Sequence, residues 1–271
     1  MQTRSFSSDP RKLPPLAPER LARLEKLEWE LADKLERALA AAATGVALVA
    51  RVGSDLSGLR FENGERPRYT HVGVALRAGG EWRVHQLLNT DEGSEGHLYR
   101  HTLVEFFRDD PFEYRAAVLL PSQELQRRIR WALESGAAEA LHSPRYSRIA
   151  FPFSTRYQSS NQWVVEVVAA AETGSSRRAS VQRHLAAQGL RPSVLRTVGL
   201  VGQSVGALRS RNTRFDDHPL RNRIRGRLAF VLESSLSAYV MRVDPVCTRL
   251  ELCAGVPLGE RCPEAPVVAG T

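Results

Sequence analysis

The stretch that decides the fold is Tyr69-Thr70-His71-Val72-Gly73-Val74-Ala75-Leu76, followed through Ala78-Gly79-Gly80-Glu81 by Trp82-Arg83-Val84-His85. Apolar and β-branched residues on both sides of a glycine-containing turn are typical of two antiparallel strands joined as a hairpin. One histidine stands at the start of the first strand, and the second lies on the neighbouring strand. We therefore expect a small antiparallel sheet in which two titratable side chains are near neighbours.

The length of the turn decides whether His71 and His85 share a face of this sheet. A three-residue turn, residues 78 to 80, pairs position 71 with position 87 and places both histidines on one face. A turn of two or four residues pairs position 71 with position 88 and places His85 on the opposite face. Both registers are compatible with the sequence.

Hydrophobic periodicity predicts further elements on both sides of the hairpin. A serine, Ser122, precedes one of the predicted helices and is its expected cap. The expected elements are an amphipathic helix from Pro18 that ends before Gly45, strands Val46–Ala50 and Tyr114–Leu120, helices Gln123–Glu134 and Asn161–Ala171, a helix around Ser180–Gln188 and a last element Leu228–Val243.

The chain divides into three parts by pattern. Residues 1–17 lack hydrophobic periodicity and read as a flexible leader. Residues 18–245 form a single α+β domain with a helical C-terminal extension, and residues 246–271 form a loosely held tail that contains all three cysteines, Cys247, Cys253 and Cys262. Their C-x5-C-x8-C spacing matches no common zinc or redox motif, so we expect neither a metal site nor a cofactor.

Composition restricts the kind of partner. The 271 residues are 42% hydrophobic and carry a net charge of +8, which suits a globular domain with a basic surface. The arginines are scattered and do not alternate with aromatic residues, so we do not expect nucleic-acid binding. No run approaches the roughly 18 apolar residues of a membrane span, so no transmembrane segment is expected. The start of the chain lacks an apolar signal region, which predicts a cytoplasmic protein as the chain stands, or a periplasmic or exported one if a signal segment has been removed.

A second part of the signature lies far downstream, at Tyr157-Gln158-Ser159-Ser160-Asn161-Gln162-Trp163-Val164-Val165. It places a small polar residue, Ser160, at the predicted start of a helix. The N-terminus of a helix stabilises negative charge, and a histidine from a facing sheet can accept a proton from a nucleophile placed there. The two parts of the signature together predict a catalytic site.

With these motifs, residues 45 to 171 resemble the bacterial domain-of-unknown-function family 2145. They are more distantly similar to permuted papain-fold enzymes of the lecithin retinol acyltransferase and cell-wall peptidase groups. The resemblance implies a permuted papain-like core, with a small antiparallel sheet packed on helices, an N-terminal helix and a mostly helical C-terminal portion. It also implies that His71 is the catalytic base, that His85 orients it, and that Ser160 occupies the position of the nucleophilic cysteine.

Serine at this position leaves three functions open. The first is a hydrolase or acyltransferase that acts on an amide, ester or acyl group through Ser160, since Ser–His pairs do work elsewhere. The second is a catalytically inactive binding module in which Ser160 only caps the helix. The third, a basic nucleic-acid-associated protein, depends on charge alone.

The expected partner is a small-molecule, lipid or peptide-like substrate. Side chains next to Ser160 are the candidates to contact it. Asp216-Asp217-His218 is either a capped turn or a wall of the same site. The candidate substrate-binding residues are Tyr157, Gln158, Asn161, Gln162, Trp163 and His218.

Overall fold

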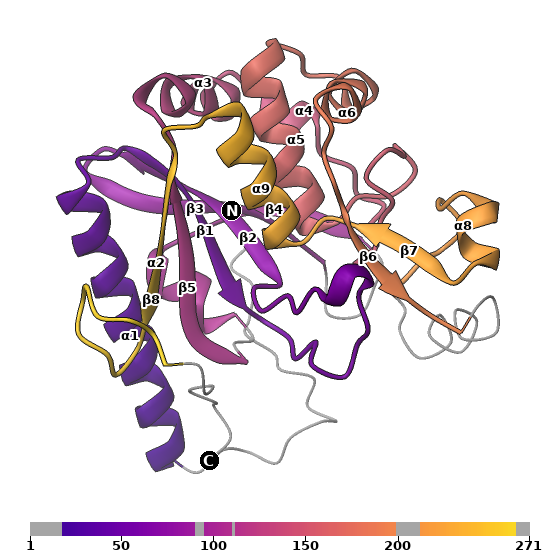
Figure 1. Ribbon diagram of the computed structural model, residues 1–271. Helices are drawn as coiled ribbons and strands as arrows, with labels where there is room; N and C mark the ends of the chain where they lie inside the picture. The colour runs from indigo at the N-terminus through magenta and orange to yellow at the C-terminus, as the bar shows by residue number, and fades with distance from the viewer. Residues whose placement is uncertain (1–17, 90–94, 110–111, 199–211, 264–271) are drawn as a thin grey trace.

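The computed structural model describes residues 18–89, 95–109, 112–198 and 212–263. The predicted leader, residues 1–17, and the glycine-bearing stretch Gly199–Gly206 lie outside the described residues. Within the described ranges the chain forms an α+β fold, as predicted (Figure 1).

The centre of the fold is a six-stranded sheet with strand order β4-β3-β2-β1-β5-β8, and every neighbouring pair is antiparallel. A separate two-stranded sheet pairs β6 with β7. The strands are β1 (Val46–Val52), β2 (His71–Ala78), β3 (Glu81–Asn89), β4 (Gly96–His101), β5 (Glu113–Leu120), β6 (Ser193–Arg196), β7 (Arg227–Phe230) and β8 (Thr248–Cys253).

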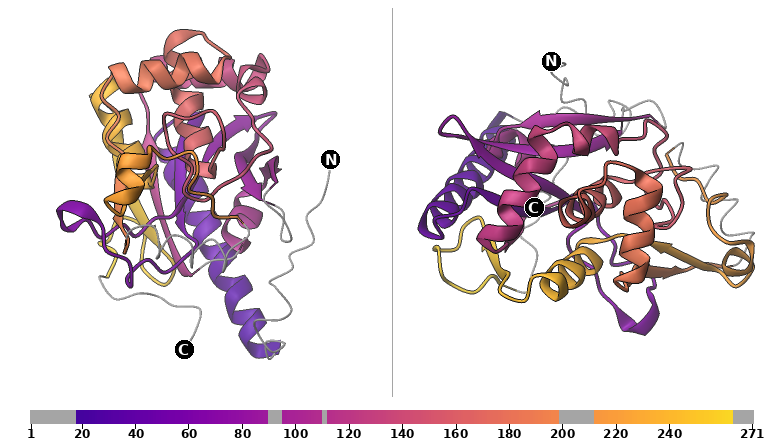
Figure 2. Two further views of the ribbon diagram at one scale, coloured as in Figure 1. Left: turned by 90° about the vertical axis from the view of Figure 1, so that its right-hand side faces the viewer. Right: turned by 90° about the horizontal axis from the view of Figure 1, so that it is seen from above.

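Helices cover both faces of the main sheet (Figures 1 and 2). One face packs against α1 and α2, and the other packs against α3, α4, α5 and α9. The helices are α1 (Pro18–Ala41), α2 (Leu103–Arg108), α3 (Gln123–Glu134), α4 (Ala137–Ala140), α5 (Ser160–Thr173), α6 (Arg178–Ala187), α8 (Leu220–Ile224) and α9 (Glu233–Val243), with a short 3-10 helix at Glu62–Gly64. We call the two sides of the sheet the α2 face and the α5 face.

Side-chain alternation along β2 assigns its residues to these two faces. Val72 and Val74 belong to the apolar cluster of α5, whereas Ala75 belongs to the cluster of α1 and α2. Because alternate residues of a strand point to opposite faces, His71 and Gly73 fall on the α2 face with Ala75.

Helix α5 is the buried helix of the fold. Every residue from Ser160 to Ala171 is buried, which fits a helix that is apolar on most of its circumference. Its cap is Ser159 rather than Ser160, because the Ser159 hydroxyl accepts from the Gln162 N–H (3.2 Å) and the Gln162 side chain accepts from the Ser159 N–H (3.4 Å). The interpretation of Ser160 as the capping residue is therefore corrected: Ser160 is the first residue inside the helix.

The C-terminal portion differs from expectation in two places. The predicted last element, Leu228–Val243, is divided between strand β7 and helix α9. Residues 246–271 are not simply a loose tail, because β8 pairs with β5 along the edge of the main sheet. A disulfide joins Cys253 at the end of β8 to Cys262, and Cys247 is a buried free thiol.

Candidate functional site

Asn161 connects the start of α5 to the start of β2. Its side-chain oxygen accepts from the Val72 N–H (2.9 Å), and its side-chain nitrogen donates to the Thr70 carbonyl (3.0 Å). The same nitrogen donates to the carbonyl of Val231 (3.1 Å). Asn161 therefore holds the peptide groups on either side of His71, and its role in this structure is to position the backbone.

This contact is available because β2 and β3 separate at their ends. Pairing between the two strands runs from Ala78↔Glu81 to Val74↔His85 and stops there, while β3 continues along β4. The Val72 N–H thus has no partner on β3, and the Asn161 side chain supplies one. The N-terminus of α5 occupies the place where the sheet opens.

The His71 side chain is held on the α2 face by Gln86. Its Nε2 atom lies 2.6 Å from Oε1 of Gln86, and Nε2 of Gln86 lies 2.8 Å from Nδ1 of His101. Because the amide oxygen can only accept and the amide nitrogen only donate, Nε2 of His71 carries the proton and Nδ1 of His101 accepts. The His71 ring also packs on Phe106 of α2, with 5.9 Å between ring centroids.

Burial controls the charge of His71. The imidazole is removed from water, and the Arg51 guanidinium adds a repulsive positive charge, which together lower the pKa of His71 to about 3. Arg51 itself forms a buried ion pair with Asp109 at 2.8 Å. His71 is therefore neutral at physiological pH, with Nδ1 as its basic atom, but it is a weak base.

His85 occupies the opposite face, which corrects the prediction that it orients His71. The hairpin turn has two residues, Gly79 and Gly80, with φ of 59° and 87°, and this register pairs His85 with Val74. His85 therefore lies on the α5 face, where it is half-buried, and burial followed by the charge of Arg100 lowers its pKa to about 4. The side chain that orients His71 is that of Gln86, the residue after His85.

Ser160 is buried on the α5 side. Its hydroxyl oxygen lies 3.5 Å from the hydroxyl oxygen of Tyr146, a residue of the apolar cluster that contains α5. Within the described part of the chain, no hydrogen bond joins Ser160 to His71 or to His85. Ser160 precedes Asn161, whose side chain bonds to the backbone on both sides of His71, so Ser160 lies near the His71 backbone. The hydrogen bond between nucleophile and base that the resemblance implies is not formed among the described residues.

The other predicted substrate-binding side chains make internal contacts. Gln162 belongs to the α5 cap, and Gln158, fully buried, donates to Leu141 O (3.0 Å) and to the Glu166 carboxylate (2.6 Å). These contacts support the fold, and a role in substrate binding stays a prediction. The remaining three side chains are donors: Tyr157 donates to the Asp216 carboxylate (3.2 Å), Trp163 to the Ala138 carbonyl (3.0 Å) and His218 to the Ile149 carbonyl (2.7 Å).

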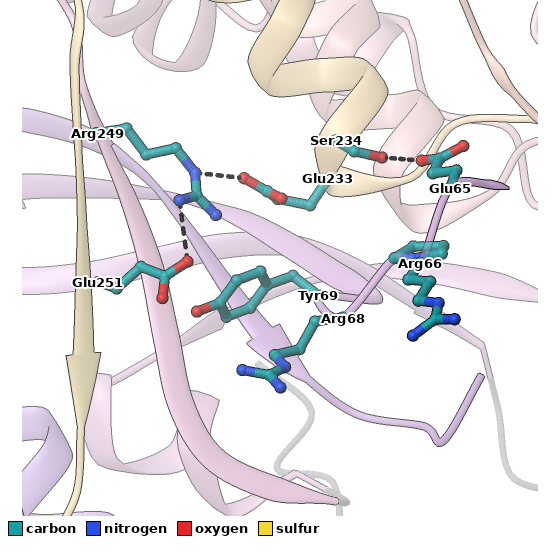
Figure 3. A pocket seen from close by; sticks show the side chains of 9 residues that line it. Glu65, Arg66, Arg68, Tyr69, Glu233, Ser234, Arg249 and Glu251 are labelled. Carbon is teal, nitrogen blue, oxygen red and sulfur yellow. Dashed lines mark hydrogen bonds and ion pairs between the residues drawn. The ribbon is translucent and has the colours of Figure 1, made fainter. Parts of the chain in front are cut away.

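A cavity of about 270 Å³ lies beside the start of β2 (Figure 3). It is open to solvent on one side and is lined by the segment before β2, the first turn of α9 and strand β8. Its lining is strongly charged, with three arginines and three glutamates. The lining residues are Glu65, Arg66, Pro67, Arg68, Tyr69, Glu233, Ser234, Arg249 and Glu251.

The glutamates of this cavity already have partners. Glu65 accepts from the hydroxyls of Ser193 (2.8 Å) and Ser234 (2.5 Å). Glu233 and Glu251 both accept from the Arg249 guanidinium, at 3.2 and 3.0 Å (Figure 3).

Donor groups in the cavity are less well satisfied. Tyr69 is 4% exposed, and its hydroxyl makes no hydrogen bond of standard geometry among the described residues, although burial and the nearby Glu251 carboxylate raise its pKa. Arg66 is exposed and forms no ion pair in the described part of the chain. Helix α9 begins without a side-chain cap, so the positive end of its dipole also faces this space. No local sequence pattern indicates this cavity, because its lining residues come from three separate segments of the chain.

Neither a metal site nor a membrane span is found in the residues that the structure describes. No group of three or more His, Cys, Asp or Glu side chains there is arranged to hold a metal ion. None of the described helices is both long enough and apolar enough to cross a bilayer.

Fold and site together define an α+β protein whose antiparallel sheet is covered by helices on both faces, with a buried histidine on one face and a helix N-terminus at the opening of the sheet. The chain belongs to the bacterial family described as "Uncharacterized protein conserved in bacteria (DUF2145)", whose model matches residues 38–240. A search of curated proteins found no match.

One solved structure is similar to this chain. It is described as "Crystal structure of metalloprotein yiiX from Escherichia coli O157:H7, DUF1105". The two share 13% sequence identity with a TM-score of 0.43, over 76% of this chain and 96% of that chain.

Proposed function

We propose that this protein is a binding module that takes a small or peptide-like ligand with an anionic group in the cavity beside Tyr69. The observation that carries the proposal is the buried Tyr69 hydroxyl, which makes no hydrogen bond of standard geometry among the described residues although the Glu251 carboxylate lies near it. Leaving such a group unsatisfied costs about 1–3 kcal/mol, and a carboxylate or phosphate oxygen bound in the cavity would remove that cost.

Charge in the cavity is consistent with this ligand class. Arg249 is neutralised by two carboxylates, and Glu65 is satisfied by two serine hydroxyls. Arg66 and the uncapped start of α9 then remain to attract an anion. The acidic side chains nearby would favour a ligand that also carries a positive group, such as an amino acid or the end of a peptide.

Isothermal titration with inorganic phosphate, acetate and glycylglycine tests this proposal. We expect binding by the native protein that is lost or weakened at least tenfold in Tyr69→Phe and in Arg66→Gln. Tyr157→Phe is the matched control, because its hydroxyl bonds to Asp216, which does not line the cavity. Equal affinity of the native protein and Tyr69→Phe for every probe would contradict the proposal.

A second candidate is a hydrolase or acyltransferase that uses Ser160 as nucleophile and His71 as base. It is favoured by one observation: Asn161, next to Ser160, bonds to both peptide groups that flank His71, whose Nδ1 is the basic atom. The Ser160 hydroxyl lies on the α5 side and the His71 ring on the α2 face, so Ser160 would have to leave Tyr146, and the two groups would have to meet through the opening between β2 and β3.

A fluorophosphonate probe separates the two candidates. Covalent labelling that disappears in Ser160→Ala and in His71→Gln would favour the hydrolase. Absence of labelling in the native protein would exclude this serine chemistry. Thiol labelling of Ser160→Cys that depends on His71 would show that only the nucleophile has been lost.

A further inference from the structure

Helix α8 is poorly buried. It has no buried residue, and Figures 1 and 2 show it at the outer end of the β6–β7 sheet, away from the main sheet. Its two aliphatic side chains, Leu220 and Ile224, are 63% and 59% exposed. They are four residues apart and so share one side of the helix.

A third exposed aliphatic side chain follows strand β6, which pairs with β7. Val198 is 85% exposed, and the preceding residue, Thr197, bonds through its N–H to the carbonyl of Gly226 (2.8 Å), just after α8. Exposed single apolar residues are common, but two on one side of a helix without buried residues, with a third just after the strand that pairs with β7, suggest an interaction surface.

Positive charge surrounds these side chains. Residues 218–232 contain four arginines and no acidic residue. Arg221 and Arg225 are exposed and form no ion pair within the described residues. Two acidic residues near this region already have partners: Asp216 pairs with Arg156 (2.5 Å), and Glu62 is shared between Arg196 (3.0 Å) and Arg227 (2.7 Å).

We propose that Val198, Leu220, Ile224, Arg221 and Arg225, which we call the α8 patch, dock the protein on the surface of a membrane that contains anionic lipids. Aliphatic side chains gain free energy by entering the boundary of the acyl chains, while flanking arginines bind lipid phosphates. A nucleic acid would gain nothing from the three aliphatic residues, and this favours the lipid surface. The protein would lie on the membrane and not span it.

Co-sedimentation of the full chain with vesicles tests the proposal. Vesicles of equal parts phosphatidylglycerol and phosphatidylcholine are compared with vesicles of phosphatidylcholine alone. We expect binding to the anionic vesicles that weakens as salt is raised. Leu220→Gln with Ile224→Gln should lower the partition about tenfold, since both side chains lose their apolar contact, and Arg221→Gln should lower it about fivefold.

The matched control is Leu21→Gln with Trp29→Gln on α1, which are also exposed, at 46% and 62%, but lie elsewhere. This control should leave the partition unchanged, and circular dichroism confirms that each variant is folded. Three results would overturn the proposal: no binding to anionic vesicles, equal binding to both vesicle types at all salt concentrations, or loss of binding in the α1 variant but not in the α8 variant. Retention on DNA without vesicle binding would likewise replace the lipid surface with a nucleic acid.

Discussion

The Nε2 atom of His71 and the Oε1 atom of Gln86 lie 2.6 Å apart, across the point where strands β2 and β3 separate. Gln86 also binds His101 through its amide nitrogen, so one fully buried amide fixes two imidazoles on the α2 face. The direction of the amide determines the tautomer of His71. The partner on β3 that the sequence predicted to be His85 is therefore Gln86, the residue that follows it.

Replacing Gln86 should destabilise the fold. Gln86→Leu removes both hydrogen bonds and leaves buried polar atoms of His71 and His101 without this partner, at a cost of about 3 kcal/mol. Urea-induced unfolding followed by circular dichroism measures the change. Gln188→Leu, on an exposed position after α6, serves as the control and should change the free energy of unfolding by less than about 0.5 kcal/mol. Equal effects of the two substitutions would contradict this view of Gln86.

Stability should fall in mild acid because buried histidines are held neutral. Burial lowers the pKa of His71 from 6.5 to about 3 and that of His218 to about 4. As pH falls below 6.5 the unfolded chain binds protons that the folded chain does not bind, so the stabilisation is complete above pH 6.5. It is lost by about pH 4 for His218 and by about pH 3 for His71. Each net proton gives a slope of about 1.4 kcal/mol per pH unit.

Asp217 acts in the opposite direction. Its burial raises its pKa from 3.8 to about 6, so its contribution is present at low pH and is lost as pH rises through 6. The two histidines outweigh this single group. Unfolding free energies measured from pH 7 to pH 4 should decline, and His218→Gln should show a shallower decline than the native protein. An unchanged slope in that variant would show that His218 does not contribute.

Close packing against the neighbouring strand requires a glycine at position 73. A Cβ atom there would lie 2.5 Å from Cγ1 of Val84 on the neighbouring strand. Gly73→Ala should therefore lower the free energy of unfolding by about 1–3 kcal/mol. Adding Val84→Ala removes the closest clash, and Gly73→Ala should then cost less than it does with Val84 present.

A double-mutant cycle tests this coupling by thermal or urea unfolding. Rescue should be partial, because Phe106 Cε2 and the His85 carbonyl would remain at 3.2 and 3.3 Å from the new Cβ. If the two substitutions were simply additive, the Val84 contact would not be the reason that glycine is required there.

Local patterns predicted much of the fold. Helix Gln123–Glu134 has the predicted bounds, and Ser122 caps it by accepting from the Leu125 N–H (3.2 Å), because amphipathic period and cap are both local. The prediction of one element over Leu228–Val243 was wrong, because a buried strand and a buried helix have similar apolar composition and the local pattern does not separate them.

The candidate site was less predictable because it depends on register and long-range contacts. The turn Gly79–Gly80 is compatible with more than one pairing, and a shift of one residue exchanges His85 for Gln86 beside His71. Strand β8 is short and charged, and it forms only because β5 offers an open edge. The cavity beside Tyr69 joins segments more than 150 residues apart, which no local pattern indicates.

The side chain of Asn161 should be among the most costly polar groups to remove. It is 4% exposed and bonds to the backbone of Thr70, Val72 and Val231, thereby joining α5, β2 and the segment before α9. Asn161→Ala leaves three backbone groups without this partner, and at about 1 kcal/mol or more for each we expect a loss of at least about 3 kcal/mol.

The matched control is Asn222→Ala in α8, a half-buried residue on an element with no buried side chain. It should change the free energy of unfolding by less than about 0.5 kcal/mol.

Asn161→Asp separates the contacts, because it keeps the acceptor for the Val72 N–H but loses both donated hydrogen bonds. Its free energy of unfolding should lie between those of the native protein and Asn161→Ala unless burial of the new charge dominates. Measuring both variants at pH 5 and pH 7 identifies that charge, because a buried carboxylate would make Asn161→Asp more stable at the lower pH, relative to Asn161→Ala. An Asn161→Ala variant as stable as the native protein would mean that other contacts hold α5 to β2, and the link between Ser160 and His71 through this residue would be lost.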